Sequence, residues 1–131
     1  INGSSIAYTP PTGATSVIYE FNYKIGWVSA GGIFHTALRI DGTQITDSRK
    51  TSGLAGSYDQ AFNNFRWRIP IGGTASSTTG RVSSWTSAKT IDMTARRFSS
   101  TYDGTLFLTY YYDGTNASFP DIPVLSITAL K

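Results

Sequence analysis

Few residues in this chain can act as a general acid, a general base or a metal ligand. It contains one histidine, His35, one glutamate, Glu20, and no cysteine. Zinc-thiolate sites, iron-sulfur clusters, cysteine nucleophiles and disulfides are therefore excluded. No GxSxG elbow, Walker loop or HExxH helix is present. Distant aspartates that converge on a sugar are the one enzymatic alternative left open, and we expect no enzyme and no cofactor.

Aromatic side chains in Ser- and Gly-rich segments point instead to binding. Tyr58 lies in GLAGSYDQ, Trp85 lies in RVSSWTS, and Tyr102 directly precedes Asp103. An exposed aromatic ring can stack on the apolar face of a pyranose, and polar neighbours such as Asp103 and Arg81 can bind the sugar hydroxyls. The alternative is that Trp85 and Tyr102 cap a hydrophobic core.

The charge pattern argues against nucleic acid as a partner. The formal net charge is +3, from 11 basic and 8 acidic residues. The clustered basic residues are Arg49 with Lys50, Arg96 with Arg97, and the alternating Arg66 and Arg68. No run is long enough to follow a phosphate backbone, so these charges are expected to be solvated surface. No apolar stretch approaches the roughly 20 residues that cross a bilayer, so no membrane insertion is expected.

The elements that must position these residues are strands. Apolar residues alternate with polar ones from Val17 to Ile25, from Ile33 to Ile40 and from Phe65 to Ile71. The second segment places His35 on the face opposite Phe34 and Leu38. Further strands are predicted at Ser5–Tyr8, Thr43–Ser48, Arg81–Trp85, Thr90–Phe98, Leu106–Tyr112 and Val124–Leu130. Because Pro70 cannot donate to a ladder, its strand is expected to lie on an edge or to end there.

Turn chemistry separates these strands. The tripeptide Asp-Gly-Thr begins at Asp41, Asp103 and Asp113, and it is typical of a hairpin because both Asp and Gly tolerate positive φ. A calcium loop is the alternative, but the characteristic spacing of its carboxylates is absent. Surface loops are predicted at 28–32, 51–57 and 72–80.

Together these patterns predict one all-β domain. With one Glu and 13 Gly among 131 residues, the chain lacks the residues that favour solvent-facing helices. Eight or more strands in this length are typical of an antiparallel β-sandwich or barrel. We expect a single β-sandwich domain over residues 1–131. Because the chain opens with Ile1, we expect it to be part of a longer protein.

Two segments near the C-terminus are apolar on both faces, namely LFLTYYY (106–112) and VLSITAL (124–130). A two-layer sandwich covers only one face of each sheet. A rotationally symmetric ring of copies would cover the other, whereas a thick monomeric core or a sugar-binding face are the alternatives. The predicted interface residues in the first segment are Leu106, Phe107, Leu108, Tyr110, Tyr111 and Tyr112.

Short blocks of the sequence resemble a known family. They are YTPPTG (8–13), VIYEF (17–21), and a middle block from Phe34 to Leu38 with Asp41-Gly42 and Arg49. These blocks are similar to the C-terminal head domains of viral fibres, particularly tail fibres and appendages of marine bacteriophages. The resemblance implies a jelly roll of the tumour-necrosis-factor and complement-head type that forms homotrimers. It carries over no catalytic residue and no receptor contact.

The resemblance implies that the chain sits on the virion and presents loops to a host cell-surface receptor, which we expect to be a glycan. In such a trimer His35 could approach the axis and hold a metal or an anion with its symmetry mates. A lone strand histidine is more often hydrogen-bonded or solvent-facing, so no metal is predicted. The alternatives are a monomeric carbohydrate-binding module of a secreted enzyme, a capsid or decoration jelly roll, and a signalling ligand of the tumour-necrosis-factor type.

Overall fold

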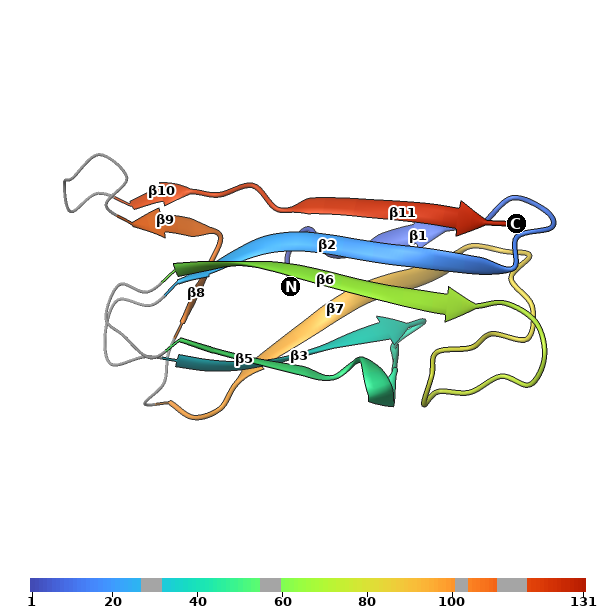
Figure 1. Ribbon diagram of the computed structural model, residues 1–131, viewed down its shortest axis with the longest axis horizontal. Coiled ribbons are helices and arrows are strands. Elements are labelled where there is room, and N and C mark those ends of the chain that lie inside the picture. The colour runs from blue at the N-terminus through green and yellow to red at the C-terminus, as the bar shows by residue number, and fades with distance from the viewer. Residues whose placement is uncertain (27–31, 55–59, 101–103, 111–117) are drawn as a thin grey trace.

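A computed structural model describes residues 1–26, 32–54, 60–100, 104–110 and 118–131, and these residues form two antiparallel sheets that pack face to face (Figure 1). Sheet A consists of β1 (Ile6–Tyr8), β7 (Lys89–Arg97), β3 (Gly32–Ile40), β4 (Thr43–Gln44) and β5 (Lys50–Leu54). Sheet B consists of β11 (Val124–Leu130), β2 (Ser16–Gly26), β6 (Gln60–Pro70) and β8 (Thr105–Leu106). A separate antiparallel pair joins β9 (Leu108–Tyr110) and β10 (Ser118–Pro120). The one helical element in the described part of the chain is the 3-10 turn η1 (Thr46–Ser48).

The core lies between the two sheets and is built from the alternating residues of their central strands. The core consists of inward residues from both sheets. Sheet B contributes Val17, Tyr19, Phe21, Tyr23 and Ile25 of β2 and Phe65 and Ile69 of β6, and sheet A contributes Phe34, Leu38 and Ile40 of β3 and Ile91 and Met93 of β7. All are buried. The predicted alternation over 17–25 and 33–40 is therefore confirmed, and so is the all-β antiparallel class.

Strands from the two ends of the chain alternate within each sheet. The last strand, β11, pairs with β2, and the short first strand, β1, pairs with β7. β7 also pairs with β3, in a register that places His35 opposite Arg96 and Ala37 opposite Thr94. These long-range pairings decide which side chains meet on the outer face of sheet A.

The hairpin at Asp41 and the role of Pro70 are as predicted. Asp41 has φ +49° and Gly42 has φ +79°, which is the left-handed pair that a two-residue hairpin between β3 and β4 requires. β6 ends at Pro70 and is the last strand on one side of the β11-β2-β6 order. The Asp-Gly turns at Asp103 and Asp113 lie outside the described residues, because both aspartates do.

The predicted strand Thr43–Ser48 is wrong beyond Gln44. Ile45 turns inward and is 2% exposed, and the next three residues form η1. Ser48 fastens this turn to sheet A: its hydroxyl donates to the carbonyl of Ile45 over 2.7 Å and accepts from the N–H of Leu38 over 2.9 Å. A buried serine that satisfies two backbone groups therefore ends the strand.

The continuous strand predicted for 106–112 is interrupted. Phe107 has φ +64° and separates β8 from β9. Its N–H donates to the carbonyl of Lys24 over 3.0 Å, and its carbonyl accepts from the N–H of Asp121 over 2.7 Å. Because the segment bends here, the alternation predicted for one straight strand does not apply across Phe107.

Three further boundaries differ from the predictions. Arg81–Trp85 is not a strand: its β-pairing is limited to two isolated bridges, Ile71 to Val82 and Ser76 to Arg81. β5 occupies part of the predicted loop 51–57, since pairing with β3 overrides its Gly and Ser content. β6 begins at Gln60 rather than Phe65, because it follows β2 to Gly26.

Candidate binding site

The outer face of sheet A carries a cross-strand row of polar and basic side chains. The register of β3 and β7 pairs His35 with Arg96, Ala37 with Thr94 and Arg39 with Asp92. These residues face away from the core, since the alternate residues of β3, namely Phe34, Thr36, Leu38 and Ile40, point inward and are buried. The site therefore follows directly from strand alternation combined with the register of two strands.

A hollow of about 400 Å³ lies on this face between β3, β7 and the segment from β4 to β5. Its lining includes His35, Ala37, Gln44, Arg49, Thr94 and Arg96. Ala37 is only 5% exposed although it points outward, because longer side chains surround it. A small residue flanked by long basic ones produces the depression.

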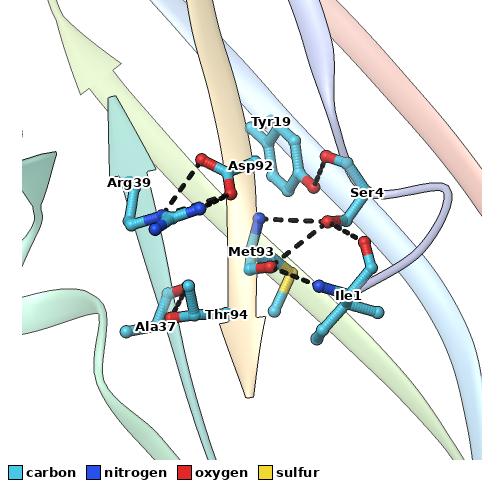
Figure 2. Close-up of polar contacts among 8 residues, drawn as sticks. All are labelled: Ile1, Ser4, Tyr19, Ala37, Arg39, Asp92, Met93 and Thr94. Atoms are coloured by element: carbon cyan, nitrogen blue, oxygen red, sulfur yellow. Dashed lines mark hydrogen bonds and ion pairs between the residues drawn. The ribbon is translucent and has the colours of Figure 1, made fainter. Parts of the chain in front are cut away.

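An ion pair neutralises one of the arginines next to the hollow. The Arg39 guanidinium binds the Asp92 carboxylate through both of its oxygens, from Nε over 3.2 and 3.1 Å and also from Nη2 (Figure 2). The hydrogen bond to Asp92 raises the pKa of Arg39 above its usual value. Figure 2 also shows Thr94 donating to the carbonyl of Ala37 over 3.3 Å, a bond between the neighbouring strands.

Arg49 and Arg96 carry positive charge into the hollow without a carboxylate partner among the described residues. Arg49 follows η1 directly, and its Nε donates to the carbonyl of Thr46 over 2.8 Å. That bond holds the stem of the guanidinium and leaves its terminal nitrogens available. Two guanidinium groups, which bind oxyanions through paired N–H donors, therefore line one small depression.

His35 borders the hollow on its other side. Its Nδ1 lies 3.0 Å from Oγ1 of Thr51 on β5, and its ring is tilted against that of Phe98, with centroids 6.2 Å apart. Phe98 follows β7 and is 60% exposed. The site therefore combines oxyanion-binding cations with an exposed aromatic ring.

The structure contradicts the exposure predicted for one glycan candidate. Trp85 is only 5% exposed; its ring meets Tyr8 edge to face, and its Nε1 donates to the carbonyl of Tyr8 over 3.0 Å. Trp85 therefore caps the core, as the alternative interpretation held, because the segment before β7 folds over the sandwich end. It borders a second hollow of about 330 Å³, which no charged side chain lines.

The other glycan candidates are dispersed or not described. Arg81 is exposed and donates from Nη1 to the carbonyl of Gly72 over 3.0 Å, so it fastens its own loop. Tyr58, Tyr102 and Asp103 lie outside the described residues. Arg81 does not line the hollow that His35 shares with the two arginines.

The residues predicted for a self-association interface are described only in part. Leu106 and Phe107 are half-buried and pack against the core of their own chain. Leu108 is half-buried on β9. Tyr110 is the last residue of β9, and its side chain is not described. Tyr111 and Tyr112 lie outside the described residues. His35 lies on sheet A, whereas Leu106 belongs to sheet B.

Sequence reasoning missed Arg49 and Arg96 as members of one site. Each is the first residue of a basic pair, and the sequence pattern of such a pair predicts only solvated surface. Arg96 also shares its strand face with Asp92 and Thr94. The missing information was the register of β3 and β7, which joins residues more than fifty positions apart, such as His35 and Arg96.

The chain has no recognised relative that would assign a function to this site. Comparison with family models, curated proteins and solved structures finds no match to this chain. Within the described ranges, His, Cys, Asp and Glu side chains form no group of three that could hold a metal ion. The same part of the chain contains no helix of the length and apolarity that crossing a bilayer needs.

Proposed function

We propose that this chain is the head domain of a virion fibre, in which three copies associate and present their surfaces to a glycan on the host cell. The observation that carries the proposal is the distribution of exposed apolar side chains. Six large hydrophobic residues are exposed in the described part of the chain. Phe62, Phe119, Ile122, Val124 and Leu130 lie on or next to strands β6, β10 and β11, and only Phe98 extends sheet A.

Strand β11 carries two of these exposed residues. Val124 is 54% and Leu130 is 37% exposed on its outer side, while Leu125 and Ile127 on the inner side are only half-buried. Neither side of β11 is therefore fully covered. Burying one such side chain contributes roughly 1.5 to 3 kcal/mol, so several per copy can offset much of the cost of association, which is on the order of 4 to 15 kcal/mol.

The free edge of β11 supports a second copy as the cover. Among the described strands β11 pairs with β2 alone, at the end of the sheet B order. Its sequence, VLSITAL, contains none of the charges or prolines by which proteins commonly protect an exposed edge. An unprotected apolar edge is a site at which another chain binds.

A closed ring gives every copy the same cover, and a threefold ring fits the fibre-head interpretation. The finer part of the proposal is a jelly roll of the tumour-necrosis-factor type. It is supported by two long-range pairings, of the last strand β11 with β2 and of the first strand β1 with β7. A virion location belongs to the same proposal.

Light scattering tests the association directly. We expect a mass of about three times the 14.2 kDa of one chain. Val124→Lys places a charge in the dry interface and should shift the mass toward that of a single chain. Thr86→Lys, at an exposed position before β7, adds the same charge and should leave the mass unchanged. A parent protein that sediments as one stable chain would contradict the proposal.

A monomeric carbohydrate-binding module is the second candidate. The observation that favours it is the hollow beside His35 with the exposed ring of Phe98 at its border. Such a module would bind saccharide at the mass of one chain. The same light-scattering measurement therefore separates the two candidates.

A further inference from the structure

We infer that the hollow lined by His35, Arg49 and Arg96 binds the sulfate or carboxylate group of an acidic saccharide. This inference rests on the proposed function, because it specifies the chemical class of the glycan that the head domain recognises. It assigns recognition to the outer face of sheet A rather than to Tyr58 and Tyr102.

Two arginines in the hollow carry positive charge that no carboxylate of the described residues neutralises. Asp92 is the one carboxylate in the row of β3 and β7 residues that borders the hollow, and Arg39 already binds it through both oxygens. Arg49 and Arg96 have no ion-pair partner in the described ranges. Two guanidinium groups line this one depression, and each can bind an oxyanion through paired N–H donors.

One of the two arginines is held in place before any ligand arrives. Arg96 lies on a central strand of sheet A, in register with His35. Arg49 is fixed by its bond to the carbonyl of Thr46, and η1 is anchored in turn by the backbone bonds of Thr46 to Ser77 over 3.1 Å and of Asp47 to Thr78 over 3.0 Å. The guanidinium of Arg49 therefore loses little conformational entropy when it binds.

The remaining groups favour a saccharide as the carrier of the anion. Gln44 and Thr94 place an amide and a hydroxyl within the same lining, and such groups exchange hydrogen bonds with sugar hydroxyls. The tilted His35 and Phe98 rings provide an apolar surface at the border. The volume of about 400 Å³ lies in the range of small-ligand sites, which is about 300 to 1,000 Å³.

A nucleic acid fits these observations less well. Proteins that follow a phosphate backbone make on the order of 6 to 10 phosphate contacts, whereas two unpaired arginines line this hollow. Ala37 forms its floor, and the surrounding side chains keep it 5% exposed, so the site is a depression rather than a track. We therefore commit to a saccharide, and RNA binding becomes an outcome of the test.

The test compares three probes that share one sugar core: sulfated lactose, sialylated lactose and unmodified lactose. We expect the sulfated or the sialylated form to bind the parent protein, to shift the backbone amide resonances of Ala37, Thr94 and Arg96, and to bind at least about tenfold more tightly than unmodified lactose. Which acidic form binds more tightly distinguishes sulfate from carboxylate. Sodium sulfate alone should bind much more weakly than the acidic sugar, because it lacks the sugar contacts.

Two variants place the binding in the hollow. Arg96→Gln should weaken binding of the acidic lactose at least about tenfold. Arg66→Gln is the matched control, since it removes the same charge from an exposed arginine on the outer side of sheet B, and it should have little effect. Ala37→Leu fills the floor without changing the charge and should abolish the amide shifts.

Three results would overturn the inference. They are equal binding of neutral and acidic lactose, equal loss of binding in Arg96→Gln and Arg66→Gln, and displacement of the acidic lactose by a short single-stranded RNA that binds more tightly. Recognition of a neutral glycan elsewhere would overturn the inference but leave the proposed attachment role intact. Binding of acidic lactose to a protein with the mass of one chain would uphold the inference and contradict the fibre head.

Discussion

Asp41 closes the hairpin between β3 and β4 and ties it to β7 with one side chain. Its Oδ1 accepts from the N–H of Thr90 over 2.9 Å, and its Oδ2 accepts from Nζ of Lys89 over 3.0 Å. The hydrogen bond from Lys89 holds the pKa of Asp41 below its usual value, against an opposing effect of desolvation. The Asp-Gly motif predicts the turn, but only the fold shows that the Asp41 carboxylate also binds β7 through Lys89 and Thr90.

We expect Asp41→Asn to destabilise the protein at neutral pH and to have a smaller effect in acid. A lowered pKa in the folded state stabilises the fold above the ordinary carboxyl value of about 3.9, and this contribution is lost as the pH falls through the folded-state value. Asparagine tolerates the positive φ and still accepts from Thr90, so the change isolates the charge. Because Asp41 is half-exposed, the loss at pH 7 should not exceed about 1 kcal/mol.

Thermal unfolding at pH 7 and near pH 2.5 measures this dependence. The Tm of Asp41→Asn should lie below that of the parent at pH 7, and the two should converge in acid. Asp47→Asn, which removes a charge from an exposed position on η1, is the control and should show little difference at either pH. A Tm gap for Asp41→Asn that persists unchanged in acid would contradict the electrostatic explanation.

At the scale of elements, the loop 72–80 supports η1 and so positions Arg49. Backbone bonds join Thr46 to Ser77 and Asp47 to Thr78. Gly80 lies at the end of this loop with φ +80°, and a Cβ there would come within 2.5 Å of Cδ1 of Ile45, a fully buried side chain. Because Gly80 has no Cβ, the loop can pack directly against Ile45, the residue that precedes η1.

Gly80→Ala should destabilise the fold more than the same change at Gly13. Both glycines have positive φ, but nothing lies within 4 Å of a Cβ at Gly13. Alanine at Gly13 should cost about 1 kcal/mol of backbone strain, and at Gly80 an additional 1 to 3 kcal/mol, roughly, of overpacking. Urea unfolding of the two variants measures the difference, and equal losses would contradict the packing explanation.

On the scale of the whole molecule, the two sheets present different surfaces to the solvent. The outer side of sheet A holds the basic hollow, whereas most exposed large apolar residues of the described chain belong to the side formed by β6, β10 and β11. Association through one side therefore leaves the other free. Three copies would then display three hollows, and linked sites bind a glycan-coated surface more tightly than any one site does.

Val124→Lys should separate avidity from affinity. Its binding to a dense layer of acidic glycan should weaken by roughly a hundredfold or more, because linked sites act at a high effective concentration. Its Kd for free acidic lactose should remain within about twofold of the parent value, since Val124 and Arg96 lie on different sheets. Surface binding and calorimetry in solution measure the two quantities, and a parallel loss of both would show that the two sides are coupled.

The order of hydrophobic and polar residues by itself determined the all-β class, the hairpin at Asp41 and, to within one residue, the boundaries of β2, β3, β7 and β11. It also placed His35 on the face opposite Phe34. These features are local: they depend on a two-residue period and on turn residues whose preferences act over a few positions. Alternation alone therefore predicts which way a strand residue points.

Only the tertiary structure decided what those residues meet. The convergence of His35, Arg49 and Arg96 depends on the β3 and β7 register and on η1, which a loop far along the chain supports. The burial of Trp85 and the positive φ of Phe107 likewise arise from partners distant in sequence. Long-range pairing is set by the packing of the whole core, and strain at one residue is tolerated when the surrounding contacts offset it, so neither can be inferred from local patterns.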